Sequence, residues 1–102
     1  MGIDVRRETE TAGELELLTD EGEVLSSLVS RGQAEDGATC LRFLDEYGDT
    51  VFNQFQLPVL AVELESLRKK LSAREAHHIT KILALVTRAT GDTHTYVRFI
   101  GD

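Results

Sequence analysis

The chain has 102 residues, and its 11 Lys and Arg against 18 Asp and Glu give a formal net charge of −7. A single core typically fills about 100–150 residues, so this length predicts one domain, 1–102, and excludes a multidomain enzyme. The content of 41% hydrophobic and 28% charged residues is typical of a globular protein, and the acidic balance disfavours nucleic acid as a partner.

The cysteine content and the hydropathy pattern favour a cytoplasmic protein. Cys40 is the only cysteine, so an internal disulfide is excluded and nothing indicates an oxidising compartment. No apolar run reaches the length of a signal peptide or of a membrane-spanning helix. We therefore expect no membrane association, and no motif predicts a cofactor.

The negative charge is concentrated in the first third of the chain. Residues 1–36 carry ten acids and three bases, a net charge of −7, whereas residues 37–102 carry eight of each. This asymmetry predicts an acidic N-terminal face on an otherwise neutral domain.

Two short strands are predicted at the start of the chain. Ile3 and Val5 alternate with polar residues within 2–9, and 14–18 (Glu-Leu-Glu-Leu-Leu) alternates in the same way. The Thr-Ala-Gly segment between them favours a turn.

A helix is predicted at 20–31, where the apolar positions fall on one helical face. Asp20 is placed to cap its start, and Gly32 is placed to end it. An extended strand over 24–30 also fits this pattern, so both alternatives stay open.

A β-hairpin is predicted over 39–53. Its two strands, 39–44 and 50–53, are rich in β-branched and aromatic residues. The connection 45–49 (Asp-Glu-Tyr-Gly-Asp) has the length and the Gly and Asx chemistry of a hairpin loop.

Two helices follow the predicted hairpin. The first is indicated by leucines that recur every three or four residues: Leu57, Leu60, Leu64, Leu67 and Leu71. Ser72 begins a capping box, Ser-Ala-Arg-Glu, which should end this helix and open a second helix that Gly91 closes. The leucine stripe is too short to indicate a coiled coil, so we expect it in the core, with a dimer seam as the alternative. Val59 and Val62 lie off the stripe and become interface candidates if they are exposed.

The last strand is predicted at 94–100, and we expect it to return to a central place in the sheet. The predicted order β–β–α–β–β–α–α–β contains hairpins and few parallel crossovers. It therefore predicts an α+β fold, a two-layer sandwich whose mainly antiparallel sheet of four to five strands is covered on one face by three helices.

Three segments have distinctive sequences: Met-Gly-Ile-Asp-Val-Arg at 1–6, Cys-Leu-Arg-Phe-Leu-Asp-Glu-Tyr-Gly-Asp-Thr-Val-Phe-Asn-Gln at 40–54, and Tyr-Val-Arg-Phe-Ile-Gly-Asp at 96–102. Together they resemble a group of small uncharacterised bacterial proteins of about this length. In that group the loop often reads Asp-Pro-Tyr-Gly-Asp, and Glu46 stands here in place of the proline. The resemblance implies a single compact bacterial domain and transfers no catalytic residue.

Polar side chains that favour a recognition site gather in the predicted hairpin and just after it: Asp45, Glu46, Tyr47, Asp49, Asn53 and Gln54. Tyr47 would anchor a partner, and the two aspartates, four residues apart, could also act as acid and base. Turn chemistry is the simpler interpretation, because Asp and Asn bond nearby N–H groups and Gly48 supplies a positive φ.

A metal site built from His78, Asp92 and His94 is an alternative hypothesis, since zinc accepts nitrogen and oxygen ligands. No His-x-x-x-His pair occurs, and adjacent helical residues such as His77 and His78 point about 100° apart. The pattern therefore favours histidines on a helix surface. Cys40 has no neighbouring base in the sequence and is predicted to be a buried thiol rather than a nucleophile.

These observations favour a small non-catalytic protein-binding module of the inhibitor, immunity or adaptor type, whose acidic N-terminal face meets a basic partner. One alternative is a small enzyme or metal-binding protein that uses the carboxylates of 45–49 and the 92–94 segment. A second alternative is a homo-oligomeric structural protein, in which the helix pair forms a homodimer.

Overall fold

The computed structural model of the chain describes residues 2–101. Its elements, in chain order, are β1 (Asp4–Thr9), β2 (Glu14–Leu18), a 3-10 turn η1 (Glu21–Glu23), α1 (Val24–Gln33), a second 3-10 turn η2 (Leu41–Phe43), β3 (Asp49–Phe52), α2 (Leu57–Arg68), α3 (Ala73–Thr90) and β4 (Thr95–Ile100). No helix in this part of the chain is both long and apolar enough to cross a membrane.

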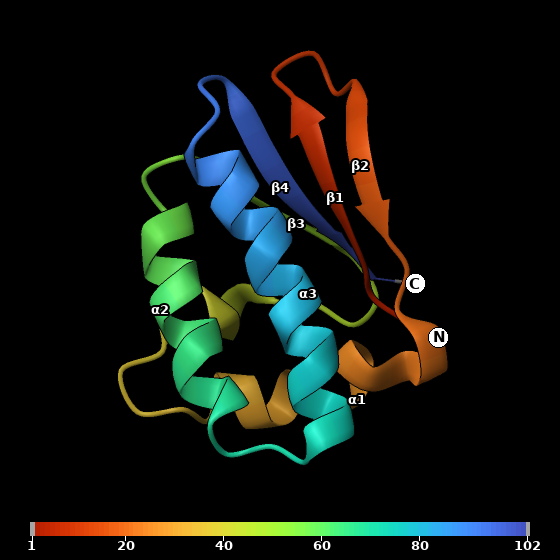
Figure 1. Cartoon of the computed structure of the whole chain (residues 1–102), viewed down its shortest axis with the longest axis vertical. Coiled ribbons are helices and arrows are strands. Elements are labelled where there is room, and N and C mark those ends of the chain that lie inside the picture. Colours follow the sequence, from red (N-terminus) through yellow and green to blue (C-terminus); the bar gives the residue numbers. More distant parts are fainter. Residues whose placement is uncertain (1, 102) are drawn as a thin grey trace.

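The four strands form one antiparallel sheet in the order β2-β1-β4-β3. The last strand lies between β1 and β3, so that Phe99 pairs with Val5 on one side and with Thr50 on the other. The helices lie on one face of this sheet, and α3 packs directly against β1 and β4 (Figure 1). The predicted α+β two-layer sandwich is confirmed with four strands, and so is the central position of the last strand.

The first third of the chain follows its pattern closely. The two N-terminal strands pair as a hairpin, and the helical interpretation of the next segment is confirmed by α1. The helix begins at Val24 rather than at Asp20, after the turn η1, and Glu23 holds the N-cap position. The Asp20 carboxylate nevertheless accepts the N–H groups of Leu25 at 2.8 Å and Ser26 at 3.0 Å in the first turn. The helix runs through Gly32 rather than stopping there. A Cβ at that glycine would lie 3.4 Å from Leu41 Cδ1, so the small residue permits close packing.

The hairpin prediction for 39–53 is wrong in its first half. Residues 41–43 form the turn η2 instead of a strand, and β3 pairs with β4 rather than with 39–44. The cause lies in α2, where the buried carboxylate of Glu63 accepts the N–H groups of Thr39, Cys40 and Leu41 at 3.0–3.2 Å. Three consecutive donors that converge on one side chain cannot be shared with a strand ladder, so the segment turns.

The helix pair forms as its sequence predicts, with one boundary shifted. The leucines from Leu57 to Leu67 are buried, so the stripe is core rather than a dimer seam, while Leu71 is half-buried beyond the end of α2 at Arg68. The capping box is present: the Ser72 side chain accepts the N–H of Glu75, and the Glu75 carboxylate accepts the N–H of Ser72 at 3.1 Å.

Candidate functional site

The segment 44–48 joins η2 to β3, and turn chemistry accounts for part of it. The positive φ predicted for Gly48 is wrong, because the glycines with positive φ among the described residues are Gly22 and Gly37. Oδ1 of Asp45 accepts the N–H of Tyr47 at 2.8 Å, which is an Asx turn. The N–H of Gly101 donates to the carbonyl of Gly48 at 2.8 Å, which fastens the loop to the chain after β4. The turn holds the backbone in place and leaves the Tyr47 ring free in solvent.

Asn53 and Gln54 have structural bonds of their own. Asn53 Oδ1 accepts the N–H of Phe55 at 2.9 Å and that of Gln56 at 3.1 Å, and Gln56 Oε1 accepts the N–H of Asn53 at 2.8 Å. Gln54 Nε2 donates to the carbonyl of Asp92 at 2.6 Å. These two candidates therefore stabilise the turn that leads into α2.

Three exposed aromatic rings lie along the length of β3. Phe43 is 70% exposed, Tyr47 is 80% exposed and Phe55 is 90% exposed, and Val51 between them is also exposed. Phe43 lies beside the strand because Thr50 Oγ1 donates to its carbonyl at 3.1 Å, while Tyr47 and Phe55 lie before and after the strand. The three rings border three different hollows along the strand, and exposed apolar side chains that line hollows are candidates for an interaction surface.

A hollow of about 400 Å³ lies beside β3 and is lined by Phe43, Asp45, Val51 and Gln56, together with the rest of β3. Tyr47 and Phe55 line smaller hollows before and after the strand. We name the four apolar side chains and the three carboxylates of this region the β3-edge surface: Phe43, Asp45, Glu46, Tyr47, Asp49, Val51 and Phe55. The sequence reasoning included its polar members and Tyr47 but not Phe43, Val51 or Phe55.

The electrostatics of the β3-edge surface are acidic. Asp49 Oδ2 lies 3.2 Å from Nη1 of Arg98, whereas among residues 2–101 neither Asp45 nor Glu46 pairs with a basic side chain. Arg42 is the one basic residue in the segment 40–56, and it does not line the hollow. A ligand of this surface would therefore meet apolar rings flanked by carboxylates.

The three metal candidates lie apart. His78 is buried, with Nε2 at 3.3 Å from Oδ1 of Asp20, and burial, only partly opposed by that carboxylate, lowers the pKa of its imidazole. Beyond the far end of α3, Asp92 lies 3.3 Å from Arg7 and His94 lies 3.3 Å from Glu10. A helix rises about 1.5 Å per residue, so on the order of 20 Å separates His78 from the other two. In the described part of the chain no three His, Cys, Asp or Glu side chains form a metal-binding group.

Cys40 is buried, as predicted. Burial, with the nearby Glu63 carboxylate, raises the pKa of its thiol, so the thiolate form that a nucleophile needs is disfavoured. The pKa of Glu63 itself is lowered, because burial is outweighed by bonds from the N–H groups and the hydroxyl that surround its carboxylate. Both residues belong to the structural support of η2.

The acids of the first third are largely engaged within the fold. Glu16 accepts bonds from Arg88 at 2.8 and 2.5 Å and from Arg7 at 2.9 Å, and the Arg88 pairing is the main cause of its lowered pKa. Glu8 is buried beneath Arg6 and Arg98. At least seven of the ten acids pair with a basic side chain or accept a main-chain N–H: Asp4, Glu8, Glu10, Glu14, Glu16, Asp20 and Glu35.

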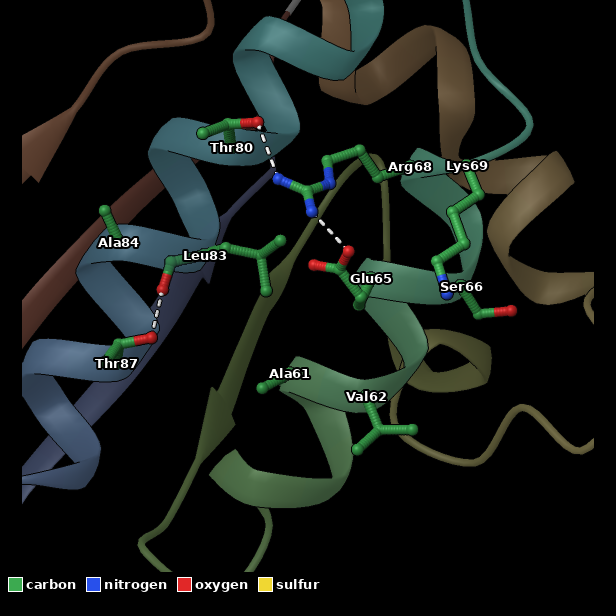
Figure 2. Close-up of a pocket in the computed structure, with 10 residues that line it drawn as sticks. All are labelled: Ala61, Val62, Glu65, Ser66, Arg68, Lys69, Thr80, Leu83, Ala84 and Thr87. Carbon is green, nitrogen blue, oxygen red and sulfur yellow. Dashed lines mark hydrogen bonds and ion pairs between the residues drawn. The ribbon is translucent and has the colours of Figure 1, made fainter.

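A second hollow of about 670 Å³ follows the groove between α2 and α3 (Figure 2). Small side chains such as Ala61 and Ala84 line it, and Val62 stands exposed at its rim. Arg68 crosses the groove and bonds Glu65 on its own helix and Thr80 on α3, so its charge is satisfied within the fold. Ser66 and Lys69 also line the groove, and within residues 2–101 neither side chain has a bonding partner.

No protein-family model matches the chain, and neither a curated protein nor a solved structure is significantly similar to it.

Proposed function

We propose that this chain is a small protein-binding module whose partner docks on the β3-edge surface. The observation that carries the proposal is the exposure of Phe43, Tyr47 and Phe55, at 70–90%, around one short strand. Aromatic side chains dominate the energetics of protein interfaces, and leaving three of them in water is costly unless a partner covers them.

The charge around these rings supports a basic partner. Asp45 and Glu46 bring two carboxylates without basic partners in the described residues, and Asp49 shares Arg98 with Glu8. Lys or Arg on the partner would complement this pattern, and association would weaken as salt screens the attraction.

The proposed function is protein binding, as the sequence predicts, but the proposed docking surface is the β3-edge surface instead of the acids of residues 1–36. The acids of 1–36 mostly bind groups of their own fold, so fewer of them are available to a partner. The bacterial and cytoplasmic setting stays a prediction from the resemblance and from the single cysteine.

The test uses capture from the source cells at low salt, followed by binding of the purified partner. The surface variant replaces Phe43 and Phe55 by serine, and the control is Leu15→Ser, an exposed position on β2 at the other edge of the sheet. We expect the surface variant to lose more than about 30-fold in affinity, the size of an interface hot spot, and the control to bind as the wild type does. Recovery of no partner, or equal affinity of the surface variant, would refute the proposal.

The groove between α2 and α3 favours a second candidate function, a homodimer through the helix pair. Val62 lines this groove and is exposed, and Val59, three residues before it on α2, is exposed as well. Analytical ultracentrifugation over a wide range of concentrations tests this candidate. A monomer at every concentration, or a dimer that survives Val62→Lys unchanged, would contradict it.

A further inference from the structure

β3 is an edge strand whose outer main chain is open. The N–H of Gly101 donates to the carbonyl of Gly48, so these residues form a hydrogen-bonded pair in the register that places Asp49 opposite Ile100. Hydrogen-bonded and non-bonded pairs alternate along antiparallel strands. The main-chain groups of Thr50 therefore face β4, whereas those of Asp49 and Val51 face away from the sheet.

No described residue bonds to these outward groups. Two hydrogen bonds near β3 use other atoms. The Thr50 hydroxyl donates to the Phe43 carbonyl, and the N–H of Asn53 donates to the Gln56 side chain. Asp49 and Val51 thus present two N–H and two carbonyl groups beside the hollow that Phe43 and Gln56 line. Unpaired edge groups of this kind are a template for another strand.

The other edge of the sheet is built differently. β2 carries Glu14 and Glu16 and pairs with β1 across an irregularity after Arg7. Charged side chains and bulges are common protections against edge pairing. β3 is short and carries one charge, Asp49, but its β-branched and aromatic run Asp-Thr-Val-Phe has no lysine, proline or bulge, so this edge is the less protected of the two.

We propose that the partner of the β3-edge surface binds as an extended segment that adds a strand to β3. This inference rests on the proposed function and specifies its mode. Residues of the segment whose side chains lie on the same side of the sheet as Asp49 and Val51 are basic, because Asp45 and Asp49 bring two carboxylates to the hollow at this edge. Residues that alternate with them face the Phe43 ring and are apolar.

A main-chain variant and a peptide probe test this mode. Val51→Pro removes an N–H that the ladder to β4 does not use, so the edge strand tolerates it while strand addition is blocked. Val51→Thr keeps both the N–H and the β-branched shape as the matched control. The probe is the acetylated and amidated pentapeptide Lys-Val-Lys-Val-Lys, followed by amide NMR titration and hydrogen exchange.

We expect the probe to bind the wild type and Val51→Thr alike and to slow exchange at the Asp49 and Val51 amides. Val51→Pro should weaken binding at least about tenfold, as lost main-chain hydrogen bonds require. N-methylation of the probe at its central residues should weaken its binding to the wild type by the same factor. This measurement tests strand addition even if the proline variant does not fold. Strand addition is overturned if the probe does not bind the wild type, or if it binds without protecting the Asp49 and Val51 amides. It is also overturned if the folded proline variant binds the probe as tightly as the wild type does, or if the methylated probe binds as tightly as the unmethylated one.

The two proposals fail separately. A purified partner that needs Phe43 and Phe55 but binds Val51→Pro as tightly as the wild type would refute strand addition and leave the docking surface standing. A partner that neither substitution affects would refute both.

Discussion

Replacing Glu63 by glutamine is expected to destabilise the fold by about 2–3 kcal/mol. Oε2 of Glu63 accepts the Thr39 N–H at 3.0 Å, the Thr39 hydroxyl at 2.7 Å and the Cys40 N–H at 3.2 Å, and Oε1 accepts the Leu41 N–H at 3.0 Å. A glutamine keeps one carbonyl oxygen and turns its NH₂ group toward the remaining donors. At least one buried N–H then loses its acceptor, at about 1–3 kcal/mol, and the others lose the assistance of the charge.

Urea unfolding followed by circular dichroism measures this loss. With a urea dependence of about 1.5 kcal/mol per molar for a chain of this size, the midpoint should fall by between about 1 and 2 M. Glu65→Gln is the matched control on the same helix, since Glu65 pairs with Arg68 at the surface and such pairs contribute about 0–1 kcal/mol. Equal midpoints for the wild type and Glu63→Gln would refute the reasoning.

The pH dependence gives the same prediction a second readout. The pKa of Glu63 is lowered from its ordinary 4.5, so its stabilising effect is present above that value and is lost as the pH falls through the folded-state pKa. The stability difference between the wild type and Glu63→Gln should therefore shrink as the pH falls below about 4.5. If the stability difference between the wild type and Glu63→Gln stays constant down to the pH of acid unfolding, the ionised Glu63 carboxylate does not stabilise the fold more than the protonated one.

Three further predictions concern single contacts. Asp20→Ala should cost about 3 kcal/mol, because three main-chain N–H groups lose their acceptor, and should speed hydrogen exchange at the Leu25 amide; unchanged exchange there would contradict it. Ser72→Ala should lower the free energy of unfolding by about 1 kcal/mol through loss of the capping box, whereas Ser66→Ala, exposed on α2, should not; equal effects would argue against the cap. Gly101→Ala should cost about 1–3 kcal/mol because its Cβ would collide with the Asp45 carbonyl, and an unshifted melting temperature would show that the loop yields.

The helix pair was predictable because its signals are local. The leucine spacing defines the buried face of α2, and the capping box at Ser72 and Glu75 lies within four residues of the boundary it marks. The turn at 41–43 was not predictable in this way. Its apolar residues resemble a strand, and the carboxylate that turns them comes from Glu63, 24 residues beyond Thr39. No local pattern reports such a contact.

The candidate site was predictable in its polar part only. Asp45, Tyr47 and Asp49 stand out by residue type, whereas Phe43 and Phe55 look like core residues until packing shows that nothing covers them. Exposure is a tertiary property, so hydrophobicity alone assigns such rings to the interior. The engagement of acids in the first third was not predictable for the same reason, because arginines from α3 and β4 join those of β1 in binding Glu16 and Glu8.

The central position of β4 determines the order in which the sheet can form. Glu8 and Arg98, which meet across the β1–β4 pair, are 90 residues apart, so this pairing closes almost the whole described chain into a loop. The β1–β2 hairpin and the α2–α3 pair can form early from near neighbours, but β3 has no strand partner until β4 arrives. Folding should therefore be slow for a chain of this length. Until β4 pairs with β3, both edges of β3 are exposed to other partly folded copies of the chain.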